Sequence, residues 1–467
     1  MRLRTLLTLL TALWSSASAL AQAPREQPRP AEPACDTPRC VAREDDSLRQ
    51  ELLWVPRAVL RLPRLALDAS MRLLVLAAGV EERHHVADEV TELLFNDERT
   101  FGVIPTAFYE TGLNPSAGVR VVHRDLAGRS EGLRLRALFA GLEQQHYEAA
   151  VHTGSRLGAL RLQLSAAYNR YDDHRFYGLG NADGVETLRG RGPSSVYERS
   201  IATRARYRVE AAYGTLGLSQ QLTPKLALGG TVQLRRRDLS AGDDGDRDST
   251  PWVDEVFKAE SLTGLSQAST DGYGELVLVW DDRDATRQDI PLTLASTGVQ
   301  LAAWAGMQAE LDGRRGSFSR LGADVRRHID LAQGNRVLVL RLRTAWAIGT
   351  MRSIPFPDLP SLGGSQLLRG YPSSRFADRG SVLATAEYRY PVQDNLASYL
   401  FIDAGRVVDT WNDIAPSGLG ASRVGFGAGL DLFSTGGLML RMQLASSIDG
   451  GLFLNLLLDA SDEYART

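Results

Sequence analysis

The stretch Val382-Leu383-Ala384-Thr385-Ala386-Glu387-Tyr388-Arg389-Tyr390 alternates between two kinds of side chain. Its even-numbered positions carry valine, alanine and tyrosine, whereas its odd-numbered positions include glutamate and arginine. Because successive side chains of a β-strand point to opposite faces, the pattern predicts a strand with one apolar and one charged face. Residues 159–168 and 337–346 alternate in the same way. An apolar outer face and a polar, water-filled interior are typical of a transmembrane β-barrel.

Further segments with this pattern follow residue 100, and their number predicts the size of the barrel. Residues 200–222 could be read as two strands, but we favour one, because bacterial barrels mostly have an even number of strands. The fold class is therefore predicted to be all-β, a sixteen-stranded antiparallel transmembrane β-barrel over residues 101–467. The expected strands are 102–111, 114–125, 131–141, 145–154, 159–170, 200–222, 225–238, 272–283, 296–310, 317–331, 335–349, 381–392, 396–409, 421–434, 436–447 and 450–460.

The connections between these segments support the same count. With sixteen strands, the long connections 171–199, 239–271 and 350–380 all fall at one end of the barrel. Short links fall at the other end, as in barrels with short periplasmic turns and longer outer loops. These short links are Thr223-Pro224, Gln393-Asp394-Asn395 and Ser434-Thr435-Gly436.

Composition narrows the function classes. The chain has 467 residues, 44 glycines and a net charge of −3, and no basic domain stands out, which argues against a nucleic-acid partner. After the N-terminal segment no run of 18 apolar residues occurs, so a membrane-spanning chain of this kind would cross with strands. We also find no recognisable catalytic group, metal site or cofactor motif, and we expect a protein that is not an enzyme.

The N-terminus predicts export from the cytoplasm. In residues 1–21, basic Arg2 and Arg4 precede an apolar core and a small-residue cleavage site, which is typical of a secretory signal peptide; a retained anchor is the less favoured reading. Residues 22–50 form a Pro-rich, charged leader of flexible composition. Within it, Cys35 and Cys40 can form a disulfide in an oxidising compartment, and we favour this over a metal site.

Residues 51–100 are expected to be a helical segment in the periplasm. Between residues 57 and 72 charged side chains recur at offsets of three and four, which places them on one helix face. Such a basic, leucine-rich helix could lie against anionic lipid or pack in the mouth of the domain that follows, and we leave both open.

Three motifs suggest a family. Leu368-Arg369-Gly370-Tyr371 lies in the connection before strand 381–392, and Leu400-Phe401-Ile402-Asp403-Ala404-Gly405 lies in the strand after it. The third motif combines Asp282-Arg283-Asp284 with Pro291 and Gly298. Together they resemble the barrel domain of the outer-membrane assembly-factor superfamily (BamA/TamA type, also called the bacterial surface antigen family). The resemblance covers roughly residues 101 to 460.

The resemblance implies an internal latch. In that family the loop folds back into the lumen, and its arginine bonds an inward carboxylate. The corresponding residues are Arg369 and Asp403, with Glu387 as a second candidate partner; a solvated loop arginine is the alternative. Gly370 would supply a backbone angle that other residues resist, and Tyr371 would pack while its hydroxyl finds a partner.

The resemblance also implies a function and a location. We expect a barrel in the outer membrane of a Gram-negative type of cell, contacting lipid and lipopolysaccharide and assisting insertion or translocation of a polypeptide or lipid client. The seam between the first and last strands would open laterally. The alternative is a passive channel or surface structural barrel, because residues 22–100 show no POTRA module, the family's periplasmic docking domain. Arg235-Arg236-Arg237, at the outer end of a strand, could contact lipopolysaccharide phosphates, but simple solvation is favoured.

Overall fold

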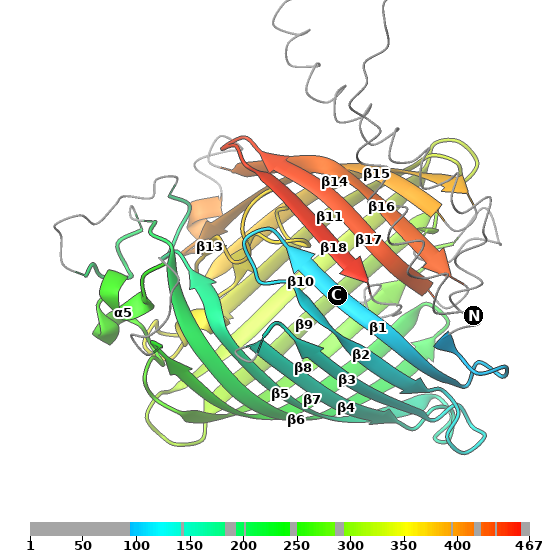
Figure 1. Cartoon of the computed structure of the whole chain (residues 1–467), viewed down its shortest axis with the longest axis horizontal. Coiled ribbons are helices and arrows are strands. Elements are labelled where there is room, and N and C mark those ends of the chain that lie inside the picture. The colour runs from blue at the N-terminus through cyan, green and yellow to red at the C-terminus, as the bar shows by residue number, and fades with distance from the viewer. Residues whose placement is uncertain are drawn as a thin grey trace, which may run out of the picture. The chain divides into compact units, whose positions relative to one another are not determined.

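The strands with alternating side chains pair side by side and close into a barrel (Figure 1). The computed structural model describes residues 94–141, 144–182, 193–199, 202–242, 250–284, 294–393, 396–414, 422–434 and 437–458. Outward side chains such as Leu276 and Leu342 are 64% and 55% exposed, as lipid contact requires. Inward side chains such as Asp324 and Asp403 are 6% and 1% exposed. The charged face predicted from sequence is therefore the lumenal one.

Sixteen antiparallel strands form the closed barrel, so the predicted fold class and strand number are confirmed. Neighbours in sequence are neighbours in the sheet throughout. The segment around 200–222 is a single strand, as the parity argument favoured. The strands are β1 (Phe101–Glu110), β2 (Ser116–His123), β3 (Gly132–Phe139), β4 (Gln144–His152), β5 (Leu160–Phe176), β6 (Ala205–Thr223), β7 (Leu226–Ser240), β8 (Ser269–Asp281), β9 (Gly298–Glu310), β10 (Ser317–Asp330), β11 (Val337–Ile348), β14 (Gly380–Gln393), β15 (Leu396–Val408), β16 (Arg423–Ser434), β17 (Gly437–Ser447) and β18 (Leu452–Leu458).

The three long connections meet at one end of the barrel and share an apolar core. They contribute Leu179, Phe257 and Phe356, which are buried together in one cluster. The connections contain the helices α5 (Val253–Val256), η2 (Ala259–Ser261) and η4 (Phe356–Asp358) and the paired short strands β12 (Ser361–Leu362) and β13 (Phe376–Ala377). A further short helix, η5 (Trp411–Ile414), follows β15.

The seam between β1 and β18 closes the barrel. Among the described residues, its register runs over only four pairs, from Ala107 opposite Leu458 to Glu110 opposite Asn455. The neighbouring β17–β18 register has seven pairs, and the β6–β7 register on the far wall has fifteen. In Figure 1, β18 (red) lies beside one end of β1 (cyan). A strand pair with fewer ladder hydrogen bonds costs less free energy to separate.

Several sequence predictions lie outside the described residues. These are the signal peptide, the leader, the Cys35–Cys40 disulfide, most of the 51–100 helical segment, and Pro291. The described end of that segment leads into β1 through a turn, with Phe95 bridged to Gly102. No helix in the described ranges is long and apolar enough to cross a membrane.

Candidate functional site

The connection from β11 to β14 folds into the lumen, and Arg369 anchors it there. The Arg369 guanidinium donates from Nε to Oδ2 of Asp403 at 2.8 Å and from Nη2 to Oδ1 at 2.8 Å. The backbone N–H of Arg369 also donates to Oδ2, at 2.9 Å. Arg369 and Asp403 are 6% and 1% exposed. This is the two-pronged geometry in which a guanidinium and a carboxylate bind most strongly.

Glu387, the second predicted partner, lies on the other side of the same guanidinium. Nη1 of Arg369 donates to Oε2 of Glu387 at 3.1 Å. Arg389 donates to the other oxygen of Glu387, and Thr385 donates to Asp403 at 2.8 Å. Two guanidiniums thus face two carboxylates, so the buried charges balance. Since a buried charge is costly unless it is paired, the four groups hold one another in place.

An aromatic ring completes the Arg369 environment. The guanidinium lies over the ring of Phe401, 3.5 Å from its centroid. Burial opposes ionisation of Arg369, but the Asp403 and Glu387 carboxylates outweigh it and raise the pKa of the guanidinium. The side chain therefore stays charged at every pH at which the protein is folded.

Close backbone packing fixes the loop against β16 and β17. Gly370 has a φ of +91°, and a Cβ there would lie 2.1 Å from the carbonyl oxygen of Ser446. Across the same contact, a Cβ on Gly425 would lie 1.7 Å from the carbonyl oxygen of Arg369. Only glycine permits these approaches. Gly427 likewise leaves room for the Phe401 ring, because a Cβ there would lie 2.7 Å from that ring.

Tyr371 extends the anchor to the next outer turn. Its hydroxyl donates to Asp449 at 2.8 Å, and Asp449 also pairs with Arg423 at 3.2 Å. Burial and then Asp449 raise the pKa of the Tyr371 hydroxyl, so it remains a donor. Its ring packs in an apolar cluster of the loop and lumen wall. The buried members of this cluster are Leu362, Leu368, Tyr371, Phe376, Leu383 and Val407.

The loop also reaches the seam. The backbone N–H of Ser365 donates to Oε2 of Glu110 at 3.1 Å, and Glu110 is the last residue of β1. Within seven residues the loop therefore contacts β1 through Ser365, β15 through Arg369 and β16–β17 through Gly370. These contacts lie on both sides of β18, so the loop crosses the inner face of the strands that flank the seam.

The third motif forms the turn between β8 and β9, at the opposite end of the barrel. Arg283 pairs with Asp281 at 2.8 Å, and Asp282 accepts the backbone N–H of Val299 at 2.6 Å. Asp284 and Thr297 form an isolated bridge. Gly298 has a φ of +103°, and a Cβ there would lie 2.5 Å from the carbonyl oxygen of Asp282. These residues shape a turn and do not contact the Arg369 anchor.

Sequence reasoning missed a second buried ion cluster, centred on Asp358. Arg235 and Arg237 each donate to Asp358 with both guanidinium prongs, at distances between 2.8 and 3.1 Å. The expectation that Arg235 and Arg237 are solvated is therefore wrong, because lumen-facing alternation turns both inward. Burial disfavours the Asp358 carboxylate, but Arg237 and Arg235 together lower its pKa. No local pattern links Asp358 to residues more than a hundred positions earlier.

Asn181 was also missed as a contact of the loop region. Its side chain donates to the Val407 carbonyl at 2.6 Å and accepts the Val407 N–H at 2.9 Å. The neighbouring Gly180 bonds Ala377 of β13 at 2.9 Å. The tract around residue 180 thus ties the β5–β6 connection to the loop that carries Arg369.

The site joins the loop to the barrel wall through ion pairs and hydrogen bonds. Among the described residues, no group of three or more histidine, cysteine or acidic side chains could hold a metal ion. Arg369, Asp403 and Glu387 are buried and bonded to one another.

Comparisons with known proteins agree with this architecture. The family model described as the Omp85 superfamily domain matches residues 126–449. Among solved structures, BamA from Haemophilus ducreyi lacking POTRA domains 1–3 matches with a TM-score of 0.52 and 14% identity, over 77% of this chain and 70% of that one. CdiB from Acinetobacter baumannii (TM-score 0.47, 12% identity) and CdiB from Escherichia coli (0.48, 11%) match 77% and 76% of this chain. The chain spans 59% and 62% of those two CdiB chains. No curated protein matches it.

Proposed function

The chain belongs to the Omp85 superfamily, and on that premise we propose that it assists insertion or translocation of a polypeptide or lipid client at the outer membrane, by lateral opening of the β1–β18 seam. The observation that carries the proposal is the combination of a seam with four described register pairs and an internal loop that bonds β1 on one side and β15–β17 on the other. Among the described residues this seam has the shortest register of the barrel, and a strand pair with fewer ladder hydrogen bonds costs less free energy to separate. The loop holds the flanking strands in order while they part.

The proposal is tested by cross-linking the seam. Tyr109 and Leu456 are register partners on the outer face, and residues opposite each other in antiparallel strands lie within disulfide reach. We expect Tyr109→Cys with Leu456→Cys, in a chain with Cys35→Ser and Cys40→Ser, to abolish acceleration of client folding when oxidised. Reduction should restore it. The measurement is the rate at which denatured barrel proteins fold into phospholipid liposomes that contain the full chain, followed by gel migration.

A matched control places the same cross-link in the far wall. Leu216 and Val232 are register partners of β6 and β7, also on the outer face and 44% and 63% exposed. Leu216→Cys with Val232→Cys should leave client folding unchanged in either redox state. If the oxidised seam variant and the oxidised wall variant accelerate folding equally, lateral opening is not the mechanism.

A second candidate function is a passive channel. It is favoured by a lumenal cavity of about 1630 Å³ beside β6–β11. Liposomes that conduct ions steadily but do not accelerate the folding of any client would support the channel and rule out insertion.

A further inference from the structure

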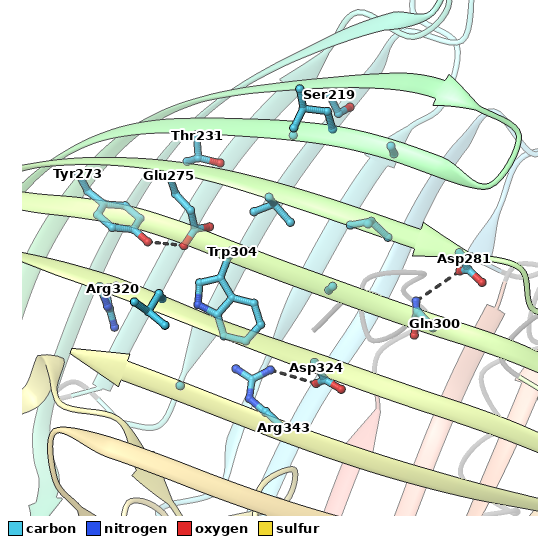
Figure 2. A pocket seen from close by; sticks show the side chains of 18 of the residues that line it. Ser219, Thr231, Tyr273, Glu275, Asp281, Gln300, Trp304, Arg320, Asp324 and Arg343 are labelled. Carbon is cyan, nitrogen blue, oxygen red and sulfur yellow. Dashed lines mark hydrogen bonds and ion pairs between the residues drawn. The ribbon is translucent and has the colours of Figure 1, made fainter. Parts of the chain in front are cut away.

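The lumen is not filled evenly, and the open part has a distinctive charge. A cavity of about 1630 Å³ lies along the inner faces of β6–β11, with Gln366 and Leu367 of the loop among its lining residues (Figure 2). Of the described residues that line it, eight are arginine or lysine and four are aspartate or glutamate. The cavity wall therefore carries an excess of positive charge in a chain whose net charge is −3.

Three arginines around a single carboxylate account for much of this excess. Asp324 of β10 lies 2.6 Å from Arg341, 3.1 Å from Arg343 and 3.4 Å from Arg326. The strand register explains the crowding, because Arg326 lies opposite Arg341 and Asp324 lies opposite Arg343. One carboxylate cannot neutralise both Arg341 and Arg343, and a guanidinium does not lose its proton in proteins. These two arginines therefore exceed Asp324 by one positive charge.

The other carboxylates of the cavity are already bonded elsewhere. Asp281 pairs with Arg283 at 2.8 Å, Asp271 pairs with Arg235 at 3.0 Å, and Glu275 accepts the Tyr273 hydroxyl. None of these three bonds the arginines of the Asp324 cluster. An additional cation, Arg320, has an aromatic neighbour and no ion-pair partner among the described residues, its guanidinium lying 5.8 Å from the Tyr273 ring centroid. It raises the positive potential on the same wall.

The arginines also face the open space. Figure 2 shows Arg320 and Arg343 on neighbouring strands, with Trp304 close to Arg343 and Asp324 bonded to it. The Arg343 guanidinium lies 4.9 Å from the centroid of the Trp304 ring, and its side chain is 26% exposed. The Trp304 ring packs against one face of the Arg343 guanidinium, which lines the cavity and can offer N–H donors to it. Planar, forked donors of this kind match phosphate and carboxylate oxygens.

We propose that the cluster of Arg320, Arg326, Arg341 and Arg343 is an anion-binding site that makes the lumen select for anions, from chloride to solutes bearing phosphate or carboxylate groups. A cluster of arginines on the wall of a confined pore concentrates anions and disfavours the passage of cations. The site does not depend on the seam: a barrel that inserts no client would still select for anions.

The experiment measures ion selectivity of the full chain in a planar phospholipid bilayer under a potassium chloride gradient. The wild type should show a reversal potential of the sign set by chloride. Arg320→Gln with Arg343→Gln removes two charges and keeps the Arg341–Asp324 pair, and it should lower the chloride-to-potassium permeability ratio at least about twofold. Added sodium tripolyphosphate should reduce the wild-type current at concentrations that leave the double variant unblocked.

Two further variants keep the result interpretable. Arg129→Gln removes one charge from an exposed turn outside the cavity and should leave the ratio unchanged. Asp324→Asn removes the carboxylate and should raise the ratio, the opposite sign to the double variant. A wild-type lumen that passes no ions, prefers potassium, or keeps its ratio in all four proteins would overturn the proposal.

Discussion

Two regions of the same lumen use arginine in opposite ways. Around the loop anchor, Arg369 and Arg389 face Asp403 and Glu387, so that each charge has a counter-charge. Along the open wall, Arg326, Arg341 and Arg343 share Asp324. In the first region the charged groups are already paired with one another, so they have little affinity for an added ion. The second remains available to an external anion. The ratio of guanidiniums to carboxylates therefore distinguishes the Arg369 anchor, where charges balance, from the Asp324 cluster, where positive charge is in excess.

Removing a charge from the Arg369 anchor should lower the stability of the barrel more than any other change proposed. Arg369→Ala leaves Asp403 and Glu387 facing each other without their shared cation, and removing one partner of a buried ion pair costs roughly 3–5 kcal/mol. We expect the barrel to unfold at clearly lower urea concentration, measured by tryptophan fluorescence of the full chain in detergent micelles. Unchanged unfolding would mean that Arg369 is not a latch.

The charge swap sharpens the same test. Arg369→Asp combined with Asp403→Arg restores one opposite-charge pair but places an aspartate beside Glu387. Stability should recover only in part relative to Arg369→Asp alone. No recovery at all would argue that the contribution of Arg369 comes from its stacking on Phe401 and not from a direct pair with Asp403.

How much of this could be predicted from sequence differs between the two regions. Strand positions and the count of sixteen follow from local alternation, which needs no knowledge of distant residues. The contact of Arg369 with Asp403 needed the resemblance to a family, because a loop arginine has no periodic pattern of its own. The Asp324 cluster depends on register, since Arg326 faces Arg341 only once the pairing of β10 and β11 is known.

The glycines of β16 show a signal that could have been read. Gly425, Gly427 and Gly429 recur at every second position, and so lie on one face of the strand. In the structure this face receives the Arg369 carbonyl and the rings of Phe401 and Tyr399. A period-two run of glycine therefore indicates where another chain segment approaches a strand closely.

A side chain added where the loop approaches β16 is expected to lower the stability of the barrel by an intermediate amount. Gly425→Ala places a Cβ 1.7 Å from the Arg369 carbonyl oxygen, so the loop must shift, and overpacking of this kind costs about 1–3 kcal/mol. The matched control is Gly214→Ala in β6, where nothing lies within 4 Å of the added Cβ. Urea unfolding should separate the two variants. Equal stabilities would show that the loop is not held closely against β16.

The smallest effect is expected where the loop meets the seam. Glu110→Gln keeps an acceptor for the Ser365 N–H but removes its charge, and a hydrogen bond to a charged group exceeds a neutral one by about 1 kcal/mol. The urea concentration at which the barrel unfolds should therefore barely change.

The β1–β18 seam has few register pairs and should respond more strongly to Glu110→Gln. In the Tyr109→Cys, Leu456→Cys background, the rate of spontaneous disulfide formation measures how often β1 and β18 are in register. A slower rate with Glu110→Gln, at unchanged urea stability, would show that the loop stabilises the closed seam from inside. An unchanged rate would restrict the latch to β14–β17 and leave seam closure to strand pairing alone.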